Sequence, residues 1–126
     1  MKVHQIMRGK DQMALARPEM AVREVLHEMT SRRAGAAIVV DDQGKLLGIF
    51  THSDFARHYQ VNDGLGSLPV ERFITRHPVT IRGDHLAVEV LRVIEERKVD
   101  DLIVVDETNT PIGIVDSQDL ARLKLI

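Results

Sequence analysis

The sequence predicts an α+β fold built from two copies of one β-α-β-β-α unit. Three observations carry this prediction: the chain repeats itself, each copy holds an apolar stripe with helical spacing, and each copy contains short apolar runs bounded by turn residues. A period of 3.6 residues indicates an amphipathic helix, and a short apolar run between turn residues indicates a buried strand.

The repeat is visible when the chain is shifted by 65 positions, which lays residues 24–57 over residues 89–122 without a gap. The strings EVL, IVVD, GI and D-x-A-R recur in register. Further upstream, Val3-x-x-Ile6-Met7 resembles Val70-x-x-Phe73-Ile74 at a shift of 67. Self-similarity of this kind indicates a duplicated structural unit. We therefore divide the chain into residues 1–64, the first copy with an N-terminal linker segment, and residues 65–126, the second copy.

The two copies are expected to contain the same elements in the same order. A short extended segment comes first, at residues 13–16 and 79–81. The helix that follows has its apolar stripe at Val22, Val25, Leu26 and Met29, or at Leu86, Val90, Leu91 and Ile94. Two strands then form a hairpin, at residues 37–40 and 46–50 or at 102–105 and 112–115, and a second helix begins near Ser53 or Gln118. Since one copy alone is too small to bury much surface, the two copies are expected to pack by their sheets.

Composition excludes several classes of protein. The chain has 126 residues, 44% of them hydrophobic and 29% charged, which is typical of a globular domain. The formal net charge of −2 provides no general attraction to nucleic acid or to an anionic membrane. Cysteine is absent, which excludes disulfides and thiol nucleophiles, and no apolar run is long enough for a membrane span or a signal peptide. We expect a soluble cytoplasmic protein without nucleic-acid or membrane partners.

The stretch GIFTHSDF, residues 48–55, has two interpretations, a helix cap and a ligand site. Thr51 and Asp54 have the spacing of a helix-capping box, and Asp116 and Asp119 repeat it in the second copy. Capping alone explains both copies, because aspartate caps a helix about as well as threonine. The other reading is a ligand site, because a helix N-terminus offers free N–H groups to a phosphate and a carboxylate there accepts from ribose hydroxyls.

The paired IVVD…GI(F/V)…D(F/L)AR segments, the entry RHPVTIRGDHLAVEVL and the duplication together resemble a tandem pair of CBS domains, also called a Bateman module. The resemblance covers essentially the whole chain. It implies two units packed sheet to sheet in a pseudo-two-fold arrangement, a regulatory ligand-binding function, and a homodimer formed through the helices.

A narrower resemblance concerns VHQIMRGKDQM, LLGIFTHSDFAR and VERFITRHPVTIRGDHLAVEVLRVIEERKVDDLIVVD. These segments resemble the C-terminal CBS pair of D-arabinose 5-phosphate isomerases, in which a sugar-isomerase (SIS) domain precedes the pair. The chain has no room for such a domain, so it is expected to be either the regulatory part of such an isomerase or a free-standing relative. The effector that this resemblance implies is an adenosine nucleotide such as AMP or ATP, or a CMP-sugar end product.

The resemblance also implies the ligand contacts of the first copy. Thr51 would meet the phosphate or ribose, Asp54 the ribose hydroxyls, and the amides of His52 and Ser53 the phosphate. The residues expected around the base are Ala36, Ala37 and Ile38 on one side and Leu15 and Ala16 on the other. Because aspartate caps as threonine does, we expect Thr51→Asp to spare the fold and to remove nucleotide binding.

The second copy departs from this pattern. Asp116 replaces the hydroxyl residue, while Asp119 remains. Thr80, Asp101 and Leu102 complete this second and weaker site. A carboxylate about 4 Å from a phosphate costs about 1–4 kcal/mol, depending on screening. We predict that the second copy binds a nucleotide poorly and is empty or holds a neutral nucleoside or a cation.

Catalysis by this chain is not expected. The sequence contains no nucleophile with an adjacent base, no phosphate-binding loop motif and no metal triad, so no cofactor and no metal site are predicted. The competing hypotheses are a free-standing CBS protein, and a dimerisation or assembly module without a ligand, in which both capping boxes serve only their helices.

Overall fold

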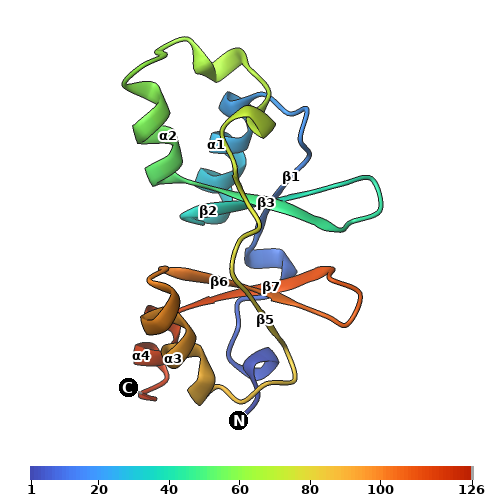
Figure 1. Ribbon diagram of the computed structural model, residues 1–126, viewed down its shortest axis with the longest axis vertical. Coiled ribbons are helices and arrows are strands. Elements are labelled where there is room, and N and C mark those ends of the chain that lie inside the picture. The colour runs from blue at the N-terminus through green and yellow to red at the C-terminus, as the bar shows by residue number, and fades with distance from the viewer. Residues whose placement is uncertain (126) are drawn as a thin grey trace. The chain divides into compact units, whose positions relative to one another are not determined.

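The computed structural model describes residues 1–125, and this part of the chain has a mixed α/β fold with four α-helices and two sheets. The order β-α-β-β-α occurs twice, as the repeat predicts. Each sheet has two helices, and both of them cover the same face of that sheet (Figure 1). No helix in the described range combines the length and the apolar character needed to cross a membrane.

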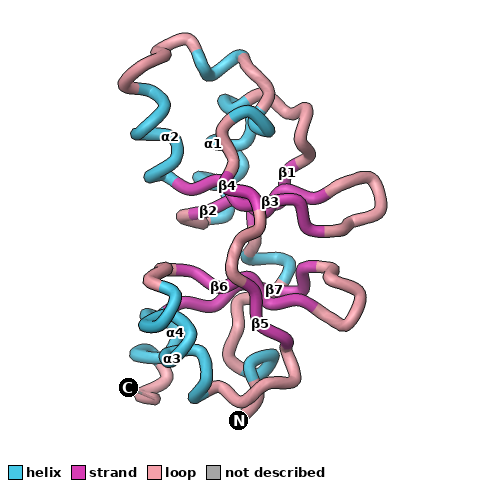
Figure 2. The backbone as a smooth tube through the Cα atoms, viewed as in Figure 1, coloured by secondary structure: helices cyan, strands magenta, loops and turns pink. Residues whose placement is uncertain are grey.

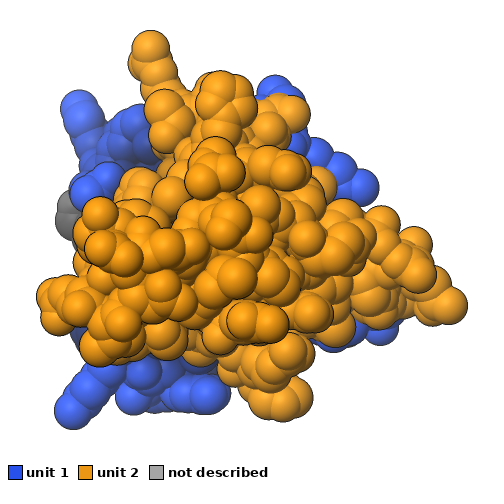
Figure 3. Space-filling model, turned by 90° about the horizontal axis from the view of Figure 1, so that it is seen from above, with its two compact units in different colours: residues 1–11, 78–126 blue, residues 12–77 orange. Residues whose placement is uncertain are grey.

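The chain forms two compact units. We call residues 12–77 the Thr51 unit, orange in Figure 3, and residues 1–11 with 78–126 the Asp116 unit, blue in Figure 3. The boundaries of the compact units lie between residues 11 and 12 and between residues 77 and 78. The predicted division after residue 64 concerns the sequence copies and stays a prediction.

The Thr51 unit has a four-stranded sheet in the order β1-β2-β3-β4. Its elements are β1 (Ala14–Ala16), α1 (Val22–Arg32), β2 (Ala36–Val40), β3 (Leu46–Thr51), α2 (His52–Tyr59) and β4 (Thr75–Arg76). β1 pairs in parallel with β2, and β2 pairs antiparallel with β3 through the predicted hairpin. Pro69 is followed by a single 3-10 turn, Val70–Arg72.

The Asp116 unit has a three-stranded sheet in the order β5-β6-β7. Its elements are β5 (Thr80–Arg82), α3 (Val88–Arg97), β6 (Asp101–Val105), β7 (Pro111–Asp116) and α4 (Ser117–Arg122). The pairing repeats that of the first sheet, with β5 parallel to β6 and β6 antiparallel to β7.

The amphipathic stripes account for the two long helices, with one correction. On α1, Val22, Val25 and Met29 are buried as predicted, and the helix ends at Arg33, whose φ of 53° breaks the helical run. On α3, Val90 is buried, but Leu86 lies before the helix begins and is 47% exposed. Leu86 therefore does not belong to the buried stripe, because the helix starts at Val88.

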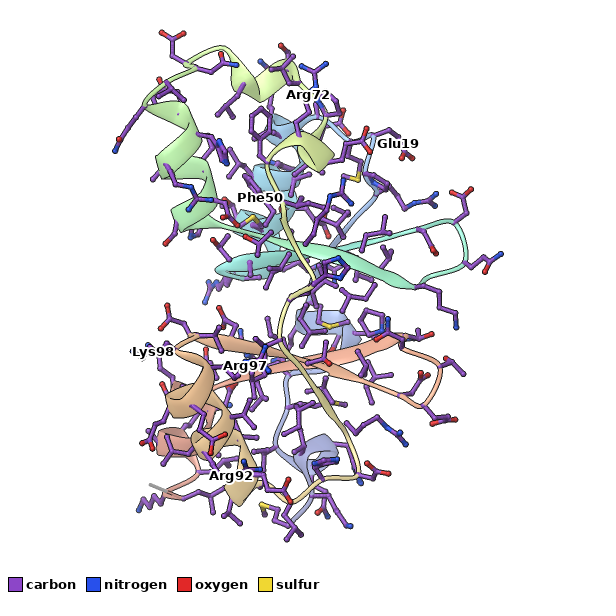
Figure 4. All side chains as sticks on the ribbon, viewed as in Figure 1. Glu19, Phe50, Arg72, Arg92, Arg97 and Lys98 are labelled. Carbon is purple, nitrogen blue, oxygen red and sulfur yellow. The ribbon has the colours of Figure 1, made fainter. Side chains whose placement is uncertain are left out.

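The core of each unit lies between its sheet and its helices. Phe50 of β3 is fully buried there, with Val25 and Met29 of α1. Figure 4 shows Phe50 on the side of the sheet that the helices cover. Leu102, Val104 and Val115 occupy the same place in the Asp116 unit.

The segment that leads into each sequence copy pairs with the hairpin of the other copy. Thr75 pairs with Ile49 of β3, and Arg8 pairs with Ile114 of β7. Figure 2 shows β4 running beside β3. Arg8 and Thr75 are 67 positions apart, the shift of the upstream repeat, so they are equivalent residues. This exchange explains why residues 1–11 belong to the Asp116 unit.

Two glycines allow these segments to approach the hairpins. A Cβ at Gly48 would lie 2.6 Å from the carbonyl oxygen of Thr75. A Cβ at Gly113 would lie 2.7 Å from the carbonyl oxygen of Arg8 and would also collide with the sulfur of Met7. The glycine of the repeated GI string is therefore required by backbone contact with the exchanged segment.

Candidate functional site

The stretch GIFTHSDF spans the junction of β3 and α2. Thr51 is the N-cap of α2, and its hydroxyl oxygen accepts from the Asp54 amide at 3.1 Å. In return, the Asp54 carboxylate accepts from the Thr51 amide at 3.0 Å and from the Thr51 hydroxyl at 3.1 Å. Both halves of a capping box are formed, so the capping reading of this motif is confirmed.

The Asp54 carboxylate is buried and fully engaged. Asp54 is 4% exposed. The second oxygen of its carboxylate accepts from Arg57 at 2.7 Å and from the Thr75 hydroxyl at 3.2 Å. A carboxylate has about four lone-pair sites, so these contacts occupy its accepting capacity. A ribose hydroxyl can reach Asp54 only by replacing one of these partners.

The first turn of α2 has an exposed amide at Ser53. The first amides of a helix have no intrahelical acceptor. The Asp54 amide is satisfied by Thr51, and the His52 amide donates to the Gly35 carbonyl at 3.4 Å. Ser53 is exposed and is the second residue of α2, a position whose amide has no intrahelical acceptor. Its amide is therefore available to an anion.

The sheet register sorts the other predicted contacts by face. Thr51 is opposite Ala36, and Leu15 is opposite Ile38, and these four residues lie on the face that the helices do not cover. Ala16 and Ala37 lie on the other face, in the core with α1. Their side chains are therefore turned away from Thr51, and only their backbone atoms border the uncovered face.

The Asp116 unit repeats the capping geometry with a different cap. Asp116 is the N-cap of α4, and its carboxylate accepts from the Asp119 amide at 3.0 Å. Asp119 accepts from the Asp116 amide at 2.9 Å and from Arg122 at 2.9 Å, and it is 1% exposed. Two carboxylates thus lie at the start of one short helix.

Arg8 lies between these two carboxylates. Its Nε donates to Asp119 at 3.3 Å and its Nη2 donates to Asp116 at 3.2 Å. Only 22% of the Arg8 side chain is exposed. In the Thr51 unit the equivalent contact to the buried aspartate comes from the neutral hydroxyl of Thr75.

Asp101 adds a third carboxylate to the Asp116 unit. It is paired with Asp116 in the sheet, at the position that Ala36 holds opposite Thr51. Burial raises the pKa of Asp101, and the neighbouring charge of Asp116 raises this pKa further, while Arg8 opposes the shift. Thr80 shares the uncovered face with Asp101, whereas Leu102 is fully buried in the core.

The sequence interpretation missed Thr75 and Arg8. Both lie outside the T-x-x-D and D-x-x-D motifs but contact the buried aspartate of each motif. The shift of 67 made them equivalent, yet it did not show that each belongs to the other copy's hairpin. Within residues 1–125, no three or more His, Asp or Glu side chains gather in a way that would hold a metal ion.

A family model for the CBS domain matches residues 3–61 and 70–125. Among curated proteins, the arabinose 5-phosphate isomerase KdsD of Pseudomonas aeruginosa is 36% identical over 97 residues. The matched region is 77% of this chain and 30% of that relative, so the chain spans less than a third of its length.

Solved structures share the fold. The CBS domain pair of protein MJ0100, in complex with 5′-methylthioadenosine and S-adenosyl-L-methionine, is 25% identical, with a TM-score of 0.84 and coverage of 98% of both chains. The CBS domain protein PAE2072 of Pyrobaculum aerophilum, complexed with AMP, is 15% identical, with a TM-score of 0.87 and coverage of 100% of this chain and 95% of the other.

Proposed function

The chain belongs to the CBS domain family, and from this premise we propose that it is a regulatory module whose Thr51 unit binds an adenosine nucleotide or a nucleotide sugar. The observation that carries the proposal is the start of α2, where exposed Ser53, whose amide has no intrahelical acceptor, follows the N-cap Thr51. A helix N-terminus with an unused amide attracts a phosphate through its hydrogen-bond donor and through the helix dipole.

The ligand would lie along the uncovered face of the β1-β2-β3 sheet. Ala36, Ile38 and Leu15 share this face with Thr51, and Leu15, which is 39% exposed, offers an apolar contact for a base, while Ala36 and Ile38 are buried. The backbone of Ala37 and Ala16 and the amide of His52 border it. The adenosine derivatives bound by MJ0100 support a nucleoside as the central part of the ligand.

We also propose that the chain is the regulatory part of an arabinose 5-phosphate isomerase. The support is its 36% identity to KdsD of Pseudomonas aeruginosa. The reaction itself would then belong to other parts of such a protein, and this module would have no catalytic role. A CMP-sugar end product is the alternative effector, and a cytoplasmic location is part of the same proposal.

The Asp116 unit is proposed to bind nucleotides poorly. A phosphate at its equivalent position would meet Asp116 in place of Thr51 and Asp101 in place of Ala36. Two carboxylates oppose a phosphate unless enough positive charge accompanies them.

Calorimetric titration with AMP, and separately with a CMP-sugar, tests this function. We expect one site per chain, and a thermal shift that corresponds to about 2.7 kcal/mol at 100 times the Kd. Two equally tight sites would contradict the difference between the units. If no nucleotide or nucleotide sugar shifted the melting temperature, the regulatory proposal would fail.

An assembly module is the second candidate, and the surface of α3 and the C-terminal segment favours it. Val88, Leu123 and Leu125 are 76%, 43% and 44% exposed. A cavity of about 360 Å³ with an apolar lining lies beside them, between residues of α3, α4 and the two chain ends. Exposed apolar groups of this kind favour self-association, so we propose a homodimer. Sedimentation velocity tests it, and a monomer at all concentrations would exclude this assembly.

A further inference from the structure

The carboxylates of the Asp116 unit outnumber its nearby cations. Asp101, Asp116 and Asp119 face Arg8 and Arg122, which leaves one excess negative charge when all five groups are ionised. Asp100 adds further negative charge next to Asp101. The Thr51 unit instead has the single pair of Asp54 and Arg57 at the same place, with no excess charge.

The difference between the units arises from paired exchanges. Thr51 corresponds to Asp116, and Thr75 corresponds to Arg8. In one unit two neutral hydroxyls contact Asp54; in the other, an aspartate and an arginine surround Asp119. Either exchange alone would add one charge beside a buried aspartate, negative for Asp116 and positive for Arg8. The two exchanges together add no net charge.

Backbone contacts hold Arg8 at this place. Its amide donates to the Ile114 carbonyl at 2.9 Å, and the Ile114 amide donates back to the Arg8 carbonyl at 3.0 Å. Arg8 cannot swing away without breaking these bonds or turning its side chain out. The chain passes to the Thr51 unit four positions later, at Gln12.

We propose that the Arg8 side chain occupies the Asp116–Asp119 motif and thereby restricts anionic ligands to the Thr51 unit. Its guanidinium satisfies the two carboxylates that the motif would otherwise present, and its charge is balanced by them. Because its charge is already balanced by these carboxylates, Arg8 does not serve as a phosphate anchor. The part of this inference that concerns ligands rests on the proposed function of the Thr51 unit.

A double-mutant cycle tests the occupancy of the motif independently of any ligand. Arg8→Thr removes the cation that pairs with Asp116, while Asp119 keeps Arg122, so we expect a clear loss in the urea midpoint. Adding Asp116→Thr removes the uncompensated carboxylate and is expected to restore much of that loss. Additive effects of the two changes would overturn the proposal.

The matched control uses Arg92, which Figure 4 labels on α3 and which forms exposed ion pairs with Glu89 and Glu96. Arg92→Thr combined with Asp116→Thr is expected to be additive, because Arg92 has no contact with the motif.

Binding stoichiometry tests the restriction of anions. The triple variant Arg8→Thr, Asp101→Ala, Asp116→Thr gives the Asp116 unit the side chains of the Thr51 unit at three equivalent positions. We expect one AMP per wild-type chain and two per triple-variant chain in calorimetry. A triple variant that binds only one AMP would contradict the restriction.

Two other outcomes are also decisive. If wild-type chain bound two AMP molecules and Arg8→Gln bound one, Arg8 would be a phosphate anchor and the proposal would be overturned. If wild-type chain bound no AMP, the proposed function would fail, and the double-mutant cycle alone would support or reject Arg8 as the occupant of the motif.

Discussion

Arg8 holds in the Asp116 unit the position that Thr75 holds in the Thr51 unit. Arg8 pairs with Ile114 and contacts Asp119 at 3.3 Å, while Thr75 pairs with Ile49 and contacts Asp54 at 3.2 Å. Each residue lies in the N-terminal segment of one sequence copy and pairs with the hairpin of the other copy. The duplicated fold thus preserves a contact to the buried aspartate while changing its charge.

The exchanged segments make Gly48 and Gly113 sensitive to the smallest side chain. Gly48→Ala places a Cβ against the Thr75 carbonyl, and Gly113→Ala places one against Arg8 and Met7. We expect each change to lower the free energy of unfolding by about 1–3 kcal/mol, the usual cost of overpacking. Urea denaturation measures it.

Gly35→Ala is the matched control, because a Cβ at Gly35 has no neighbour within 4 Å. This variant is expected to unfold near the wild-type midpoint. If Gly48→Ala were as stable as Gly35→Ala, the close approach of the Thr75 segment would not hold in solution.

The Arg8 contact changes what Thr51→Asp is expected to do. Asp116 is accepted beside Asp119 because Arg8 pairs with both, but Thr51 has only the neutral Thr75 at the equivalent place. Thr51→Asp should therefore cap α2 yet lower the melting temperature, because it adds an uncompensated charge beside buried Asp54. Thr51→Asp combined with Thr75→Arg should recover part of this loss.

Both of these variants should lose AMP binding, whereas Thr51→Ser, which keeps the hydroxyl, should retain it. Calorimetry measures the binding and thermal unfolding measures the stability. AMP binding that persisted in the folded double variant would mean that Thr51 serves only as a cap.

Asp101 should make stability depend on pH. Its pKa in the folded chain lies above the ordinary value of 3.8, because burial and Asp116 disfavour the charged form. Between the ordinary and the raised pKa, the folded state holds a proton that the unfolded state has lost, so stability falls as pH rises through this window. Above the window the full penalty remains.

Asp101→Asn removes this penalty. We expect the variant to melt above the wild-type chain at pH 7, with a difference that shrinks as the pH falls to 3.8 and below. Thermal melts across this range measure it, with the exposed Asp63→Asn as a control. A wild-type chain that was more stable than Asp101→Asn at pH 7 would reverse the sign and contradict the prediction.

Local patterns were sufficient for most elements of the fold. The stripe of Val22, Val25 and Met29 predicted α1, because a helix that is buried on one side repeats apolar residues with a period of 3.6. The continuous apolar runs predicted β2 and β6, because both faces of these strands are buried. Leu86 was misassigned, since an apolar residue before a helix has the same spacing as one inside it.

The sequence by itself determined the duplication, the order of the elements and the capping boxes at Thr51 and Asp116. These features depend on neighbours within a few residues along the chain. Only the tertiary structure decided that Thr75 and Arg8 contact the buried aspartates, because each lies far from its partner in sequence, on a segment exchanged between the copies. It likewise turned Ala16 and Ala37 into the core, since strand register and pleat determine which face a side chain joins.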